Sequence, residues 1–116
     1  MKYFKMSEFA CKCGCGESNM NSTLLKMLDM ARGMANVPFV ITSGYRCEKH
    51  NKAIGGSETS SHTKGLAVDI RTSTSSERHA ILRYVIMAGA TRIGIAKDFI
   101  HVDIDSSKPD ELIWLY

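Results

Sequence analysis

The stretches Leu66-Ala-Val-Asp-Ile70 and Phe99-Ile-His-Val-Asp-Ile104 decide the fold of this chain, because each is an apolar run of strand length with polar residues inside it. A strand that buries its residues rarely carries an unpaired imidazole or carboxylate, since burying an unpaired charge is very costly. Alternate side chains of a strand share a face, so His101 and Asp103 point the same way. Asp69 is flanked by apolar residues in the same manner. We therefore expect the polar residues of the two strands to share a partner.

The rest of the chain supplies helices and further short strands around this pair. Its 116 residues suffice for one compact domain, so we expect a single domain over residues 1–116. The sequence predicts a helix at about 21–35 that ends before Pro38, a strand at 39–43 and a mostly loop segment at 44–61. A strand at 66–71 follows, and then a helix that begins at the capping box of 74–77 and ends at Gly89. The last predicted elements are a hairpin of strands at 92–95 and 99–104 and a short apolar strand or tail at 112–116. This order predicts an α+β fold with a small antiparallel sheet of four to five strands and two main helices.

Three residues are candidate metal ligands. His62 lies in a polar, glycine-flanked loop, seven residues before Asp69. If the two strands are neighbours, Asp69 and His101 face one point, and His62 reaches it from the loop. Two histidines and one carboxylate with an open fourth position form a catalytic zinc set. From spacing alone, a metal site is favoured no more than its alternative. In that alternative, each residue is a separate polar residue of the core with its own hydrogen-bond partners.

A hydrolytic zinc site also needs a general base within hydrogen-bond reach of the attacking water. Asp98 lies three residues before His101, on the turn that enters the strand, and Asp103 lies on the same strand face as His101. Asp103 has a second possible role, as a carboxylate that orients a ligand histidine. The spacing does not choose between Asp98 and Asp103 as the base.

Arg46 follows directly on the first predicted strand and precedes a long loop. An arginine in this position suits bidentate capture of a carboxylate. Its alternatives are a solvated surface side chain or a structural salt bridge. Near the end of the chain, Trp114 and Tyr116 are candidates for a cleft wall, although core packing is the simpler explanation of Trp114.

The four cysteines admit three interpretations. Cys11, Cys13 and Cys15 alternate along the chain, and Cys47 follows 32 residues after Cys15. This is not the spacing of a zinc ribbon. The simplest interpretation is a small buried turn in which the thiols act as compact hydrophobic groups. The alternatives are a second, structural metal site or a disulfide with Cys47.

The bulk properties are those of an ordinary globular protein, with 44% hydrophobic and 23% charged residues. A net charge of +3 favours a polyanionic partner such as a cell wall, but no basic cluster interleaved with aromatics indicates nucleic-acid binding. No stretch approaches the ~20 apolar residues of a membrane span. The N-terminus lacks the apolar segment of a signal peptide, so we expect a cytoplasmic monomer that reaches the cell wall only after release.

The motifs together resemble the zinc D-alanyl-D-alanine carboxypeptidase-like peptidases, a family that includes phage and bacterial peptidoglycan peptidases. The resemblance rests on Ser43-Gly-Tyr-Arg46, on Ser60-x-His62-x6-Asp69 and on His101-x-Asp103. Its small single-domain branch also often carries Phe-x-Cys-x-Cys-Gly-Cys-Gly and Arg-Cys-x-x-His-Asn, which occur here at 9–16 and 46–51. The resemblance therefore covers nearly the whole chain.

This resemblance implies roles for individual residues. His62, Asp69 and His101 match the zinc ligands, Arg46 matches the arginine that binds a substrate carboxylate, and Ser60 matches a substrate-contacting position. In many relatives an acidic residue three positions before the last histidine is the base, which corresponds to Asp98. In the small branch the carboxylate of Asp103 recurs instead, so the base stays open between these two.

The implied function is zinc-dependent hydrolysis of peptidoglycan stem peptides. Carboxypeptidase action on D-Ala-D-Ala and endopeptidase action on L-Ala-D-Glu use the same set of residues, so the bond cut stays open. One alternative is a catalytically silent domain that keeps zinc for structure and binds cell-wall peptide or a protein partner. Another is a cysteine-based zinc module for nucleic acid, which the cysteine spacing and modest charge disfavour.

Overall fold

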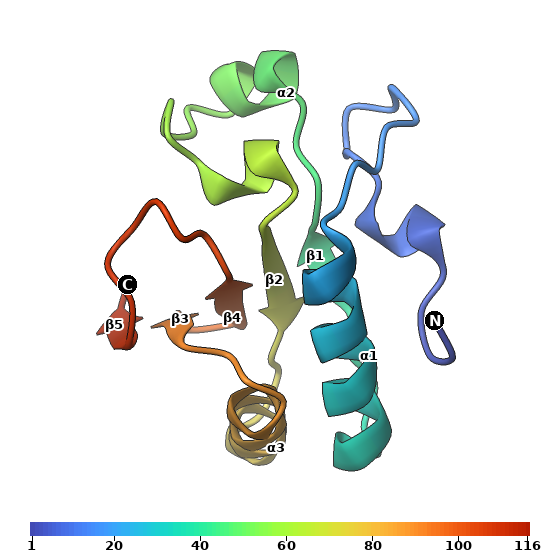
Figure 1. The fold of residues 1–116 in the computed structure, drawn as a ribbon, viewed down its shortest axis with the longest axis vertical. Coiled ribbons are helices and arrows are strands. Elements are labelled where there is room, and N and C mark those ends of the chain that lie inside the picture. The colour runs from blue at the N-terminus through green and yellow to red at the C-terminus, as the bar shows by residue number, and fades with distance from the viewer.

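The computed structural model describes residues 1–116 and contains one five-stranded sheet (Figure 1). Two of its three helices pack with the sheet, and the third, short helix lies apart from it. The helices are α1 (Ser22–Ala35), α2 (Glu48–Ala53) and α3 (Ser75–Met87), with short 3-10 turns η1 (Met6–Phe9) and η2 (Ser61–Lys64). The strands are β1 (Ile41–Ser43), β2 (Ala67–Arg71), β3 (Arg92–Ile95), β4 (Phe99–Asp103) and β5 (Leu112–Leu115). The predicted α+β class, with two main helices and a small sheet, is confirmed.

The strands lie in the order β1-β2-β4-β3-β5. All neighbours are antiparallel except β3 and β5, which are parallel. The expected hairpin of β3 and β4 is present, and β2 lies directly beside β4. In that pair Asp69 is opposite His101, so the two polar residues that the sequence places in apolar strands are immediate neighbours.

Local sequence signals determine the ends of both main helices. The side chain of Asn21 accepts hydrogen bonds from two backbone N–H groups in the first turn of α1, at 2.8 and 3.2 Å. Asn36 ends this helix in a left-handed conformation with φ 53°, two residues before Pro38. Thr74 caps α3 by accepting from the N–H of Glu77 at 3.0 Å. The predicted helix boundaries are therefore confirmed for physical reasons that the sequence contains.

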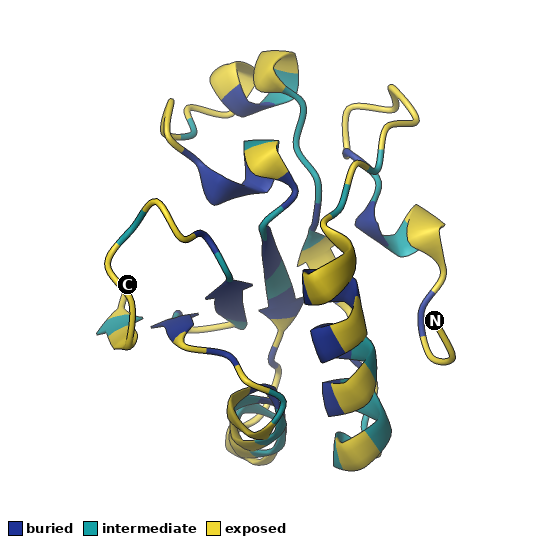
Figure 2. Ribbon diagram, viewed as in Figure 1, coloured by how far each residue is buried: buried dark blue, intermediate teal, exposed yellow.

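One apolar core joins the two helices to the sheet. In Figure 2, the buried side of α1 faces the strands and its exposed side faces away from them. The inward residues of β2 and β4 are the branched residues that alternate with Asp69 and His101. Fully buried members of this core include Leu24 and Leu28 of α1, Ile81 and Val85 of α3, and Ile70 and Ile100 of the sheet.

Two details differ from the sequence prediction. The segment 44–61 contains the short helix α2, which we did not predict within this mostly loop segment. Only Asn51 of this helix is buried, so there is no apolar periodicity to reveal it. The first strand begins at Ile41 rather than at Phe39. The last apolar segment forms β5, which pairs with β3 but leaves Ile113 and Leu115 exposed.

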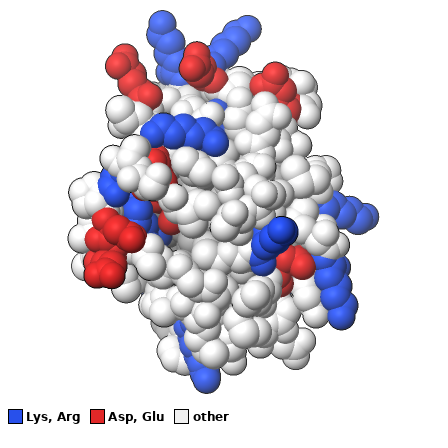
Figure 3. Space-filling model, viewed as in Figure 1, with Lys and Arg blue, Asp and Glu red and all other residues white.

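No helix combines the length and the apolar character that a membrane-crossing segment needs. On the face shown in Figure 3, basic and acidic side chains are interspersed and form no continuous basic patch. This distribution agrees with the modest net charge.

Truncation of the core should have a large effect on stability. Leu28→Ala removes a fully buried side chain between α1 and the sheet, so we expect the free energy of unfolding to fall by about 2–5 kcal/mol. Met30→Ala is the matched control on the same helix, because Met30 is 58% exposed. Urea unfolding followed by circular dichroism measures both, and equal losses in the two variants would contradict the assignment of the core face.

Candidate metal centre and its cavity

A single row of residues across the sheet builds the base of the site. Cross-strand pairing places Ser43, Asp69, His101, Gly94 and Trp114 in line from β1 to β5. Gly94 leaves room in this row, because a Cβ there would lie 2.6 Å from Nε1 of Trp114. The indole therefore reaches across β3 to within 5.6 Å of the His101 ring, centroid to centroid. The row combines a carboxylate, an imidazole and an aromatic wall on one face of the sheet.

His62 comes to this row from η2, just before β2. The hydroxyl of Ser60 accepts a hydrogen bond from the His62 N–H at 3.3 Å and caps the turn. Gly65 closes the turn with φ 69°, a left-handed conformation that suits glycine. Nδ1 of His62 lies 2.9 Å from the carbonyl oxygen of Gly44, so the ring is held by the segment after β1.

The three predicted ligands converge on one point. Oδ1 of Asp69 lies 3.0 Å from Nδ1 of His101 and 3.4 Å from Nε2 of His62. One ligand atom from each residue lies within 4.8 Å of the other two. The two histidines are buried and Asp69 is partly exposed, so the cluster is shielded from solvent but not closed off from it.

The ring nitrogens of His62 and His101 that point away from the common point also have hydrogen-bond partners. The carbonyl of Gly44 accepts from Nδ1 of His62, and Oδ2 of Asp103 lies 2.7 Å from Nε2 of His101. When each of these nitrogens carries the proton, Nε2 of His62 and Nδ1 of His101 have free lone pairs directed at the common point. Metal-binding histidines in proteins have this arrangement. The donor set of two imidazoles and one carboxylate fits zinc.

The electrostatics of the cluster favour positive charge at its centre. Burial disfavours the ionised Asp69, but hydrogen bonds from His101 and His62 outweigh it and lower the pKa of Asp69 to about 2. Burial likewise disfavours a charged imidazole, yet the carboxylates of Asp103 and Asp69 raise the pKa of His101. Asp69 is therefore ionised across the neutral pH range and available as an anionic ligand.

The two candidate bases lie in different places. Asp103 is 1% exposed and contacts His101, and its Oδ1 accepts from Nε of Arg92 at 2.7 Å. Burial opposes ionisation of Asp103, but hydrogen bonds from His101 and Arg92 lower its pKa. Asp98 is exposed at the far end of β4 and lines a separate hollow beside Arg71 and Thr72. The structure thus brings Asp103 to the cluster and leaves Asp98 outside it.

A cavity of about 410 Å³ opens over the three ligands. Its wall combines residues from all five strands or their flanking loops. The cavity is lined by Arg46, Ser57, Ser60, Ser61, His62, Asp69, Arg92, Phe99, His101, Asp103, Lys108, Trp114 and Tyr116. Trp114 therefore forms a wall of the cavity, and core packing does not account for it.

Arg46 is the cation in this cavity that lacks an acidic partner. Its Nη1 donates to the side chain of Asn51 at 2.8 Å and its Nη2 to the hydroxyl of Ser43 at 3.2 Å. These neutral acceptors hold the guanidinium in place without neutralising it. Arg92 and Lys108, by contrast, each lie within 4.0 Å of a carboxylate. Arg46 is therefore free to bind an anionic group in the cavity.

A comparison of the sequence with known protein families agrees with this geometry. A family model described as Peptidase M15 matches residues 2–103. The chain belongs to the peptidase M15 family. Peptidases of this family are zinc-dependent, which agrees with the ligand cluster. No curated protein matches the sequence.

The matched region contains the ligand cluster, Arg46 and Asp103, and ends with β4. The last thirteen residues, which include Trp114 and Tyr116, lie beyond it. One wall of the cavity therefore comes from a part of the chain outside the family match.

Several residues that support the site were not predicted from the sequence. Arg92 pairs with Asp103 across β3 and β4, and Gly94 makes space for Trp114. A glycine inside a predicted strand is a signal of close approach, so Gly94 could have been found. The contact of Gly44 with His62 is made by a backbone carbonyl, which carries no sequence signal.

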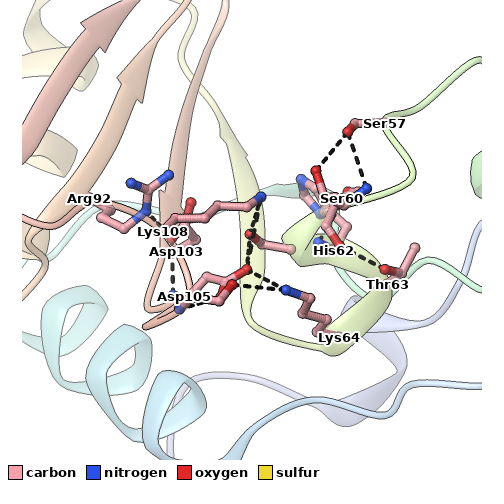
Figure 4. Close-up of polar contacts among 12 residues, drawn as sticks. Ser57, Ser60, His62, Thr63, Lys64, Arg92, Asp103, Asp105 and Lys108 are labelled. Carbon is pink, nitrogen blue, oxygen red and sulfur yellow. Dashed lines mark hydrogen bonds and ion pairs between the residues drawn. The ribbon is translucent and has the colours of Figure 1, made fainter.

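Asp105, which was also not predicted from the sequence, supports the turn that carries His62. This buried carboxylate accepts from the hydroxyl of Ser61 at 2.7 Å. It also accepts from Nζ of Lys64 at 3.1 Å (Figure 4), and both partners lie in η2. Burial opposes its ionisation, but hydrogen bonds from Ser107, Ser61 and Lys64 hold its pKa well below the usual value. Asp105 thus ties the segment after β4 to the turn that carries His62.

Substitutions of the two candidate bases should differ in their effect on metal binding. Asp103→Asn removes the charge that orients His101. We therefore expect the zinc affinity of the site that contains His62 and His101 to fall by about 10–100-fold. Asp98→Asn is the control and should leave that affinity unchanged, because Asp98 lies outside the cavity. Competition with a chromophoric chelator measures both variants. Equal affinities in Asp103→Asn and the parent chain would contradict the orienting role.

Proposed function

We propose that this chain is a zinc-dependent peptidase that hydrolyses peptidoglycan stem peptides. The observation that carries the proposal is the convergence of His62, Asp69 and His101 at the base of a cavity that also contains the unneutralised Arg46. The family match supports peptide hydrolysis, and the sequence motifs resemble peptidases of the bacterial cell wall.

In this proposal, some residues of the site bind the zinc and others orient the residues that bind it. His62, Asp69 and His101 hold the zinc, which when bound polarises a peptide carbonyl and lowers the pKa of water toward about 7. Asp103 keeps the proton of His101 on Nε2 and leaves Nδ1 for the metal. Arg92 in turn holds Asp103, so this pair is a positioning device behind the ligand.

Arg46 supplies substrate recognition in the proposal. A guanidinium with planar donors suits bidentate binding of a carboxylate, and stem peptides carry carboxylates along and at the end of the chain. Ser60 also lines the cavity, where its hydroxyl is available to a bound peptide. Trp114 and Tyr116 form the opposite wall.

The bond that is cut is either the terminal D-Ala-D-Ala bond or the L-Ala-D-Glu bond. Muropeptides digested with the zinc-loaded protein and identified by mass spectrometry distinguish them, because only the first releases free alanine. In the same proposal the protein acts on the cell wall after release from the cytoplasm.

One observation favours a second function, a zinc domain that binds cell-wall peptide without cutting it. Asp69 and Asp103 are the acidic residues that line the cavity, and Asp69 is a ligand. Both oxygens of Asp103 already accept hydrogen bonds, from Arg92 and His101. A role for Asp103 as general base requires it to give up one of these donors. Binding of muropeptides without any cleavage product would select the silent domain.

Removal of a ligand should abolish the activity. His62→Ala removes one of three protein ligands, so we expect loss of both the zinc at this site and muropeptide hydrolysis. His79→Ala is the control, because His79 is exposed on α3 and remote from the cavity. Zinc content and product formation are measured on the same samples. Full hydrolysis by His62→Ala would refute the proposal.

Loss of the guanidinium should affect substrate binding more than turnover. Arg46→Met keeps an unbranched apolar stem but removes a charge-assisted interaction, so we expect KM to rise about 10–100-fold. Arg83→Met, on the exposed face of α3, is the control. An amidated peptide should show the same rise with the parent enzyme and little further change with Arg46→Met. Additive effects of the amide and the substitution would show that Arg46 does not bind that carboxylate.

A further inference from the structure

The four cysteines of the chain meet at one point, away from the His62–Asp69–His101 cluster. Cys11, Cys13 and Cys15 lie in the N-terminal segment, and Cys47 lies just before α2. Their sulfur atoms all lie within 4.8 Å of one another. Two segments far apart in the sequence therefore bring every thiol of the molecule together.

The distances between the sulfurs suit a tetrahedral metal site. The Sγ atoms of Cys11 and Cys13 are 3.5 Å apart, and each lies 3.7 Å from that of Cys47. Four sulfurs around a zinc ion, at the usual Zn–S distance of about 2.3 Å, are separated by about 3.8 Å. A disulfide needs about 2.05 Å and joins sulfurs in pairs. The near-equal spacing of three sulfurs, with the fourth close by, is therefore that of a shared ligand.

The backbone is shaped to present the alternating cysteines to a common centre. In an extended chain, Cys11, Cys13 and Cys15 would follow one another along a strand at intervals of nearly 7 Å. Here Gly14 and Gly16 adopt left-handed conformations, with φ 86° and 80°, and the chain coils around the centre. The N–H of Cys11 closes the loop by donating to the carbonyl of Glu17 at 2.8 Å.

Two of the sulfurs also accept backbone hydrogen bonds. The N–H of Cys47 points at the sulfur of Cys11, and the N–H of His50 points at the sulfur of Cys47, both at 3.4 Å. Such donors stabilise negative charge, and metal-bound cysteine is a thiolate.

Burial excludes the simplest alternative. Cys11 is buried and Cys47 is half-buried, but Cys13 and Cys15 are exposed. Exposed thiols gain little from packing, so the interpretation of a buried turn with cysteines as compact hydrophobic groups is wrong for Cys13 and Cys15.

We propose that Cys11, Cys13, Cys15 and Cys47 bind a second zinc ion in a closed, four-coordinate structural site. All four positions are filled by protein sulfur, so this site has no open position for a substrate. Tetrahedral four-sulfur sites also accept iron, and the metal analysis below separates the two.

The site would hold the segment that carries Arg46. Cys47 follows Arg46 directly, and its sulfur caps α2. Next to it, the N–H of Tyr45 donates to the carbonyl of Phe9 at 2.9 Å, and a Cβ at Gly44 would meet that carbonyl oxygen at 2.7 Å. The N-terminal segment thus lies tightly along residues 44–47. A metal at the cysteines would lock this contact and keep Arg46 at the edge of the cavity.

Zinc stoichiometry of the full chain, purified under reducing conditions, tests the proposal. We expect two zinc ions per chain in the parent protein and one in His62→Ala/His101→Ala. Cys13→Ala/Cys15→Ala should lose the other ion, whereas Lys12→Ala, the control between the cysteines, should keep both. In His62→Ala/His101→Ala, X-ray absorption should show four sulfurs at about 2.3 Å around zinc. This measurement leaves the cysteines intact and does not depend on the folding of a cysteine variant.

The outcomes separate this proposal from the catalytic one. A single zinc that survives His62→Ala/His101→Ala supports the cysteine site and contradicts the catalytic centre. A single zinc that is lost in that variant, with four reactive thiols or a disulfide in the parent chain, overturns the cysteine site. Iron in place of zinc at the cysteines also overturns it as stated.

Discussion

The register between β2 and β4 is the constraint on which the rest of the structure depends. It sets Asp69 opposite His101 on one face of the sheet and the branched residues of both strands on the other. Because side chains alternate along a strand, a slip of one residue in either strand would turn its polar residues into the core. The burial of Ile70 and Ile100 against the helices therefore also determines the geometry of the metal centre.

The polar face is completed by segments that have no role in the core. The turn η2 brings His62, the segment after β1 brings the carbonyl of Gly44 and the side chain of Arg46, and β5 brings Trp114. Each is held by its own contacts, such as the cap of η2 by Ser60. A rigid sheet whose flanking loops supply further binding residues is a common arrangement for binding and catalysis.

Charge is distributed unevenly around the cavity, and the distribution separates two functions. Arg92 is paired with Asp103, so its charge stabilises a buried carboxylate that would otherwise be costly. Arg46 has only neutral partners in the protein. Two arginines in one cavity thus differ in what they offer a ligand, and only Arg46 offers an unneutralised charge.

The sequence by itself determined the α+β class, the ends of α1 and α3, and the presence of polar residues inside two apolar strands, because caps and hydrophobic alternation are local properties of the chain. It also pointed to His62, Asp69, His101 and Arg46 through their motifs. That the two strands are neighbours was a condition that only the structure met. Tertiary structure decided which carboxylate reaches the cluster, Asp103 rather than Asp98, and where the four cysteines meet. It also showed α2, which has no apolar periodicity. These features depend on contacts between residues far apart in the chain, and spacing within one segment carries no information about such distances.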